Sequence, residues 1–106
     1  MPYSTQFFAG EGGSGLAVLY TVPDQYVAVL RDLEALNLGG ATDSLDLITE
    51  IPGPLAVTWG RLNNVPSGEA AQWSGRLVMN PGDQLQAYSG THDWAILASG
   101  YLLSAP

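Results

Sequence analysis

The chain has 106 residues, of which 46% are hydrophobic and only 12% charged; three arginines, no lysine and ten acidic residues give a net charge of -7. This length suits one domain that buries a sizeable core, and it excludes two such domains. The acidic balance repels phosphate backbones and so excludes direct nucleic-acid binding as a main function. Because the sequence contains no cysteine, it also excludes disulfides, thiol nucleophiles and thiolate metal sites.

Residues 1–15 are polar and glycine-rich, with Phe7 and Phe8 as an isolated aromatic pair. They lack the basic and apolar regions of a secretory signal, and no apolar run in the chain reaches the roughly 18 to 20 residues of a membrane span. We therefore expect a soluble product of the cytoplasm without membrane insertion. Residues 1–15 form either a flexible terminus or an arm whose two phenylalanines dock on a partner, and residues 16–106 form the folded domain.

Glycines and prolines divide the remaining chain into short segments at intervals typical of an all-β sandwich or barrel. Pro52-Gly53 and Pro81-Gly82 have the chemistry of a type II turn, in which glycine adopts the positive φ. The predicted strands between these breaks are 16–22, 26–37, 44–51, 55–62, 70–79, 84–89 and 94–103. The sequence thus predicts a compact single-domain β-sandwich, like a jelly roll or Greek key, of about seven or eight strands.

The segment 24–39 fits two structures. Its apolar spacing, with Asp24 as a possible N-cap and Gly39 after the last turn, is that of an amphipathic helix. The surrounding β pattern favours a strand instead, with Val27, Val29, Leu33 and Ala35 on one face and Arg31 between them. We predict the strand.

Two further patterns concern the arrangement of strands. Residues 94–103 are apolar on both faces, which is typical of a central strand or of a strand at a subunit interface. Residues 19–28 resemble residues 77–87, each reading as strand, proline turn, glutamine and strand. This similarity predicts two matching hairpins, although chance similarity accounts for it equally well.

The sequence lacks the parts that enzymes require. A chain without lysine has no Walker loop, and no G-x-S-x-G motif is present. The letters GEGGSG over 10–15 match a dinucleotide fingerprint, but neither the strand before it nor the helix after it is predicted. His92 lies in a turn, and the acids form no calcium-loop pattern. We predict a non-enzymatic protein without cofactor or metal.

Aromatic residues leave open a second function class, carbohydrate binding. Most of them fit a sandwich core, where aromatic side chains are usual. If one tryptophan stacks on a sugar, Trp59 is the best candidate, because Val57, Trp59 and Arg61 alternate onto one face of a strand. Asn63 and Asn64 follow it with groups that hydrogen-bond to hydroxyls.

Several short motifs resemble small virion proteins of tailed phages that infect actinobacteria. They are GLAVLYTVP over 15–23, VAVLRDL over 27–33, WSGRLVMNPGDQL over 73–85, Trp94 and SGYLL over 99–103. The resemblance covers roughly residues 15–104. It implies a compact β-sandwich and a non-catalytic structural role as a minor tail or head-decoration protein.

The implied partners are other virion proteins and further copies of the chain, in a virion assembled from subunits made in the host cytoplasm. The candidate interface residues are Phe7, Phe8, Arg31, Arg76 and Tyr101. With three arginines against ten acids, Arg31 and Arg76 are the first groups to test as contacts to a partner. The alternative is that they pair with Asp32 and Asp83 in ordinary surface ion pairs, each worth less than about 1 kcal/mol.

Overall fold

The computed structural model describes residues 3–12, 15–53, 55–89 and 93–105, with side chains from residue 15 onward. These ranges contain eight strands and no helix, so no helix here is long and apolar enough to cross a membrane. The strands are β1 (Tyr3–Gly12), β2 (Gly15–Thr21), β3 (Tyr26–Asn37), β4 (Asp43–Ile51), β5 (Leu55–Val65), β6 (Ala70–Met79), β7 (Gln84–Ser89) and β8 (Trp94–Ser104). The all-β prediction is confirmed, and segment 24–39 contains a strand, not a helix.

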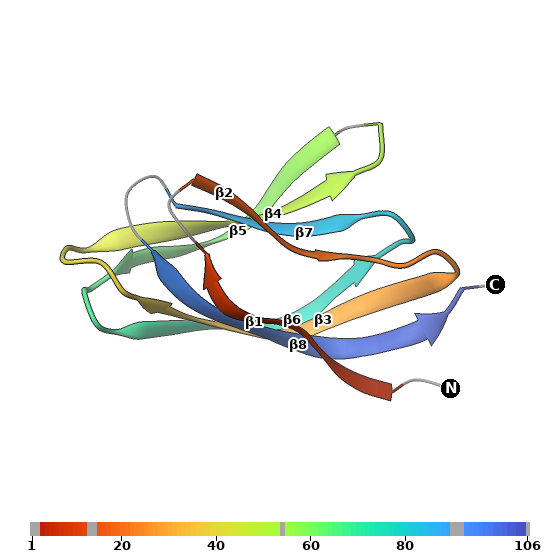
Figure 1. Ribbon diagram of the computed structural model, residues 1–106, viewed down its shortest axis with the longest axis horizontal. Coiled ribbons are helices and arrows are strands. Elements are labelled where there is room, and N and C mark those ends of the chain that lie inside the picture. Colours follow the sequence, from red (N-terminus) through yellow and green to blue (C-terminus); the bar gives the residue numbers. More distant parts are fainter. Residues whose placement is uncertain (1–2, 13–14, 54, 90–92, 106) are drawn as a thin grey trace.

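The strands form two four-stranded antiparallel sheets that face each other (Figure 1). We call the sheet with the order β1-β8-β3-β6 the first sheet and the sheet with the order β2-β7-β4-β5 the second sheet. Consecutive strands along the chain lie in different sheets, except for β4 and β5, which form a hairpin in the second sheet. This arrangement is an eight-stranded jelly roll. The predicted sandwich architecture is confirmed.

The two similar segments 19–28 and 77–87 are not hairpins. β2 pairs with β7 and β3 pairs with β6, so each proline turn carries the chain from one sheet to the other. The local pattern identified strand, turn and strand correctly. It did not predict which strands pair, because pairing depends on contacts between segments distant in the sequence.

The N-terminal segment is part of the sandwich rather than an arm ahead of it. The backbone of Tyr3–Gly12 forms the edge strand β1, which is paired with β8 along its length. β8 therefore lies between β1 and β3, which confirms the prediction of a central strand. A central strand needs a hydrogen-bonding neighbour on each side, and β1 fills one of these places.

A bulge in β3 changes which side chains face the core. Leu30 pairs with Gly100 and Asp32 pairs with Ser99, so Arg31 is an extra residue on β3. Ala28 and Leu30 face the core before the bulge, and Leu33 and Ala35 face it afterwards. The predicted shared face of Val27, Val29, Leu33 and Ala35 is wrong, because it assumed uninterrupted alternation.

Apolar side chains of both sheets form one core cluster between them. Its largest side chains are Trp94, Leu30, Leu33, Leu45, Leu47, Met79 and Leu85. The predicted proline–glycine turns have the expected positive φ at glycine, +120° at Gly53 and +86° at Gly82. With the inner faces packed together, the outer faces of the two sheets are the surfaces open to other molecules.

Candidate interaction surfaces

Three of the predicted interface residues lie on one surface, the outer face of the first sheet. Arg31 and Arg76 are exposed and lie opposite each other at the bulge between β3 and β6, where the register skips both. Tyr101 of β8 is paired with Val29, the outward-facing residue of β3 that precedes Arg31. We call this surface the arginine face and define its described members as Val27, Val29, Arg31, Asp32, Glu34, Leu36, Gln72, Ser74, Arg76, Val78, Ala95, Leu97, Ser99, Tyr101 and Leu103.

The arginines on this face have no intramolecular partner among the described side chains. Asp32 accepts a hydrogen bond from Ser74 Oγ at 3.0 Å, not from Arg31. The buried carboxylate of Asp83 accepts the backbone N–H of Asn80 at 2.9 Å within the NPGD turn, so it is not available to Arg76. The predicted pairing of these arginines with Asp32 and Asp83 is therefore wrong.

Apolar side chains accompany the charged groups on the arginine face. Val29 is only 1% exposed although it points away from the core cluster, since its register partners Val78 and Tyr101 flank it. Val78 itself is 50% exposed, and Leu97 of β8 is 49% exposed. This face combines exposed apolar side chains with arginine, a residue that is enriched at protein interfaces.

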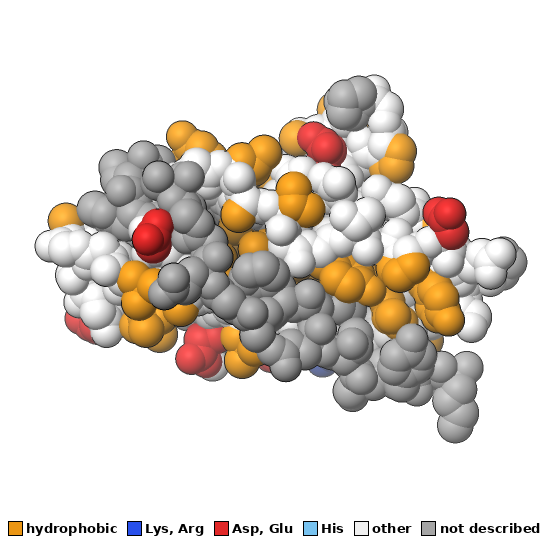
Figure 2. Space-filling model, in the orientation of Figure 1, with side chains coloured by type: hydrophobic (Ala, Val, Ile, Leu, Met, Phe, Trp, Pro, Cys, Tyr) orange, Lys and Arg blue, Asp and Glu red, His pale blue; other side chains and the backbone are white. Residues whose placement is uncertain are grey.

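The outer face of the second sheet carries a different set of apolar groups. Leu16 and Val18 of β2 are 57% and 51% exposed, and Tyr88 of β7 is paired with Leu16. Figure 2 shows hydrophobic side chains along this margin of the molecule, over β2 and the β4–β5 hairpin. Its basic group, Arg61, is already paired, which distinguishes this face from the arginine face.

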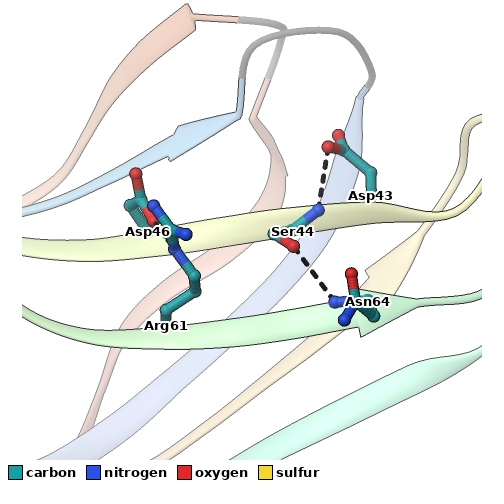
Figure 3. Close-up of polar contacts among 5 residues, drawn as sticks. All are labelled: Asp43, Ser44, Asp46, Arg61 and Asn64. Atoms are coloured by element: carbon teal, nitrogen blue, oxygen red, sulfur yellow. Dashed lines mark hydrogen bonds and ion pairs between the residues drawn. The ribbon is translucent and has the colours of Figure 1, made fainter.

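Arg61 and Asp46 point toward each other from the neighbouring strands β5 and β4 (Figure 3). Arg61 Nε donates to Asp46 Oδ1 at 2.5 Å. This hydrogen bond and the charge of Asp46 raise the pKa of the guanidinium above its ordinary value. The pair is exposed, so it orders the surface more than it stabilises the fold.

The same strands carry a polar cluster nearer the end of β5 (Figure 3). Ser44 donates its backbone N–H to Asp43 Oδ1 at 2.8 Å, and its Oγ accepts the backbone N–H of Asn64 at 3.0 Å. Asn64 has a positive φ of 51°, a conformation that asparagine tolerates better than most residues. The cluster fixes the backbone at the end of the β4–β5 ladder, which gives Asn64 a structural role.

The structure does not bring the three predicted glycan-binding residues together. A register shift leaves Trp59 as an extra residue of β5, and its ring packs against the core and against Trp73. The ring centroids of the two tryptophans are 4.9 Å apart in an edge-to-face arrangement, and Trp59 Nε1 is buried. The shared face predicted for Trp59 and Arg61 is therefore wrong. Asn63 is exposed roughly 13 Å further along the strand, at about 3.3 Å per residue.

Other predicted sites are less informative. The side chains of Phe7 and Phe8 and the whole of His92 lie outside the described residues. Within the described ranges, no group of three His, Cys, Asp or Glu side chains is arranged to hold a metal ion.

Sequence reasoning missed one structural residue, Asn37. Its buried amide donates to the carbonyls of Ala41 and Val65, and its Oδ1 accepts the N–H of Gly39, each at 2.9 Å. An asparagine followed closely by Gly39-Gly40 is a turn signal that also indicates this role.

No protein-family model and no curated protein matches the sequence. Solved structures match its fold. A protein of Bacillus endospore appendages, described as disulfide-linked pili, has a TM-score of 0.61 and 8% identity, with 100% of this chain and 90% of that chain covered. The acid-stable capsid of Helicobacter pylori bacteriophage KHP30 contains a chain with a TM-score of 0.61 and 13% identity, with 97% and 94% covered.

A family 29 carbohydrate-binding module, CBM29-2, matches less well. Its TM-score is 0.48 and its identity 12%, with 96% of this chain and 91% of that chain covered. A likeness at that level carries no functional inference. The two better matches establish that this chain shares its fold with subunits of a phage capsid and of a pilus.

Proposed function

We propose that this protein is a non-enzymatic structural subunit of a tailed-phage virion, a minor tail or capsid-decoration protein that acts by self-association and by packing on other virion proteins. The observation that carries the proposal is the exposure of large apolar side chains on the outer faces of both sheets, together with two arginines of one face that have no partner among the described side chains. A rigid sandwich with such faces is suited to packing against other proteins.

The fold supports this proposal at the level of class. The chain has the architecture of a phage capsid chain and of a pilus chain, and both of those proteins are described as parts of larger assemblies. Because this chain has no cysteine, its association is non-covalent and does not use disulfides. The sequence motifs that resemble small proteins of actinobacterial phages support the narrower assignment.

The proposed partners follow from the charge of the chain. A net charge of -7 disfavours DNA as a direct partner, so the subunit binds proteins on the particle. Its proposed location is the virion, after synthesis in the host cytoplasm. Since each sheet has an outer face of its own, one face can serve self-association while the other binds a different virion protein.

The alternative function, glycan binding through Trp59, Asn63 and Asn64, finds no specific contact in its favour. Stacking on a sugar requires an exposed aromatic face beside polar side chains, and the Trp59 ring instead packs against Trp73 and the core. Glycan binding is retained as an outcome of the tests below.

Mass-spectrometric identification of the chain in purified virions, separated into heads and tails, tests the proposal. We expect the chain in one fraction at a constant copy number per particle. Detection only in the lysate, or loss from virions in a gentle wash, would contradict a structural role. A glycan-array screen of the folded chain, expected to be empty, tests the alternative in parallel.

A further inference from the structure

Charges on the arginine face are separated along β3 in a self-complementary way. Around the bulge, in chain order, the outward-facing residues of β3 are Val29, Arg31, Asp32 and Glu34. The bulge places Arg31 and Asp32 consecutively on the outside, because the core residues Leu30 and Leu33 flank them. The charges on the two sides of the midpoint between Arg31 and Asp32 therefore have opposite signs. When a second β3 strand runs in the opposite direction about this midpoint, positive groups of one strand face negative groups of the other.

Hydrogen bonds hold the carboxylates in place without neutralising them. Ser74 Oγ donates to Asp32 at 3.0 Å, and Gln72 Nε2 donates to Glu34 at 2.7 Å. Both donors are neutral, so the negative charges remain available to an external cation. Arg31 and Arg76, on the other side of the midpoint, are without an intramolecular partner among the described side chains.

A two-fold axis that lies in the plane of contact and perpendicular to β3 places positive groups of one copy over negative groups of the other. It puts Arg31 over Asp32 of the second copy, with Glu34 within reach of the same long side chains. An axis parallel to the strands would put Arg31 over Arg31, which is repulsive. Charge thus selects the antiparallel arrangement of the two β3 strands.

The apolar groups fit the same arrangement. On β8, Tyr101 lies beyond the bulge on one side and Leu97 on the other, so the two-fold axis puts Tyr101 of each copy over Leu97 of its partner. The exposed Leu97 side chain is then covered by an aromatic ring. Both contacts occur twice, as an isologous interface requires.

The size of the face is sufficient. The twelve residues of β3 and the four strands of the first sheet span roughly 40 by 19 Å, at about 3.3 Å per residue and 4.8 Å per strand. Full overlap buries about 760 Å² per copy on this flat geometry, close to the roughly 800 Å² of a standard interface. An unpaired sheet face of this area is large enough for a stable dimer.

We propose that the arginine face is the self-association surface of this protein, through an isologous dimer in which the β3 strands of the two copies cross antiparallel and Arg31 of each contacts Asp32 of the other. The inference rests on the self-association included in the proposed function. It adds the surface, the symmetry and the charge pairs.

The test uses two charge reversals, Arg31→Glu and Asp32→Arg, in the full-length chain. Each makes like charges meet at both ends of the contact, so sedimentation equilibrium should show a two-fold fall in mass and a dissociation constant raised by at least about 100-fold. An equimolar mixture of the two variants should restore the dimer, because the introduced glutamate then meets the introduced arginine and the retained Asp32 meets the retained Arg31. Both substituted positions are exposed, and unchanged circular dichroism will verify that each variant is folded.

Arg61→Glu is the matched control for Arg31→Glu, because it makes the same change in net charge on the second sheet and should leave the dimer intact. If wild type and both reversal variants are all dimeric, the arginine face is not the contact and self-association stands. If the wild type is monomeric throughout the concentration range, the inference and the proposed self-association both fail. Two monomeric variants that do not form a dimer when mixed would contradict the proposed two-fold register.

Discussion

Val22 and Asp83 join the two proline turns that connect the sheets. The backbone N–H of Val22 donates to the carbonyl of Asp83 at 2.9 Å, and the N–H of Gly82 donates to the carbonyl of Val22 at 3.0 Å. Val22 follows β2 and Asp83 precedes β7, so these bonds extend the β2–β7 pairing beyond both strands. The two similar sequence segments therefore meet at their turns and close one end of the sandwich together.

Gly82→Ala should destabilise the protein by about 1 to 2 kcal/mol, the usual cost of a left-handed conformation in a non-glycine residue. Gly82 has a φ of +86°, and an added Cβ would lie 3.1 Å from Pro52 Cγ. Gly40→Ala is the matched control, with no atom within 4 Å of the added Cβ, and should change stability by less than about 0.5 kcal/mol. Urea denaturation of both variants measures the difference, and equal midpoints would contradict the argument.

The sequence predicted the strands and turns well because these depend on local chemistry. Pro81-Gly82 encodes a turn without reference to the rest of the chain, and the β-branched and apolar residues around Val29 favour a strand over the competing helix. The segment at Phe7 and Phe8 was not predicted as a strand, because its glycine-rich composition is that of a mobile terminus. Pairing with β8 overrides that preference.

The candidate sites were predicted less well, since they depend on register. Alternation assigns side chains to faces only until the first bulge, and both Arg31 and Trp59 are bulge residues. A bulge results from how neighbouring strands align, which a single sequence does not reveal. Arg31, Arg76 and Tyr101 were chosen because cations are scarce and residues 94–103 are apolar on both faces. The structure places all three on one face, and their role as contacts stays a prediction.

Asn37→Ala should cost about 3 kcal/mol, because three hydrogen bonds at about 1 kcal/mol each disappear. The fully buried amide connects β3, the following loop and the end of β5, and its loss leaves the carbonyls of Ala41 and Val65 and the N–H of Gly39 without this partner. Asn63→Ala, at an exposed position of β5, is the control and should be nearly neutral. Equal thermal stability of the two variants would show that Asn37 is not the anchor of these loops.

Trp59→Ala should lower stability by about 2 to 4 kcal/mol, near the lower end of large aromatic truncations because the ring is only partly buried. The reason is loss of the contact with Trp73 and with the core at the β5–β6 side of the sandwich. Chemical denaturation measures this change. A variant that keeps wild-type stability while the wild type binds a glycan would instead support the carbohydrate function.

Gly75→Ala should be destabilising because of Trp73 and not because of backbone conformation. A Cβ at Gly75 would lie 2.9 Å from Cζ2 of the Trp73 ring, closer than such atoms approach, and 3.3 Å from Cη2, which is a tight contact. The ring cannot swing away freely, since its edge-to-face contact with Trp59 holds it at a centroid distance of 4.9 Å. We therefore expect a cost of about 1 to 3 kcal/mol in the free energy of unfolding, typical of overpacking.

In a Trp73→Ala background the obstacle is gone and Gly75→Ala should be neutral or slightly stabilising, because alanine restricts the unfolded chain more than glycine does. A double-mutant cycle by urea denaturation measures the coupling energy between Trp73 and Gly75 directly. If Gly75→Ala costs the same in both backgrounds, the ring of Trp73 is not the obstacle.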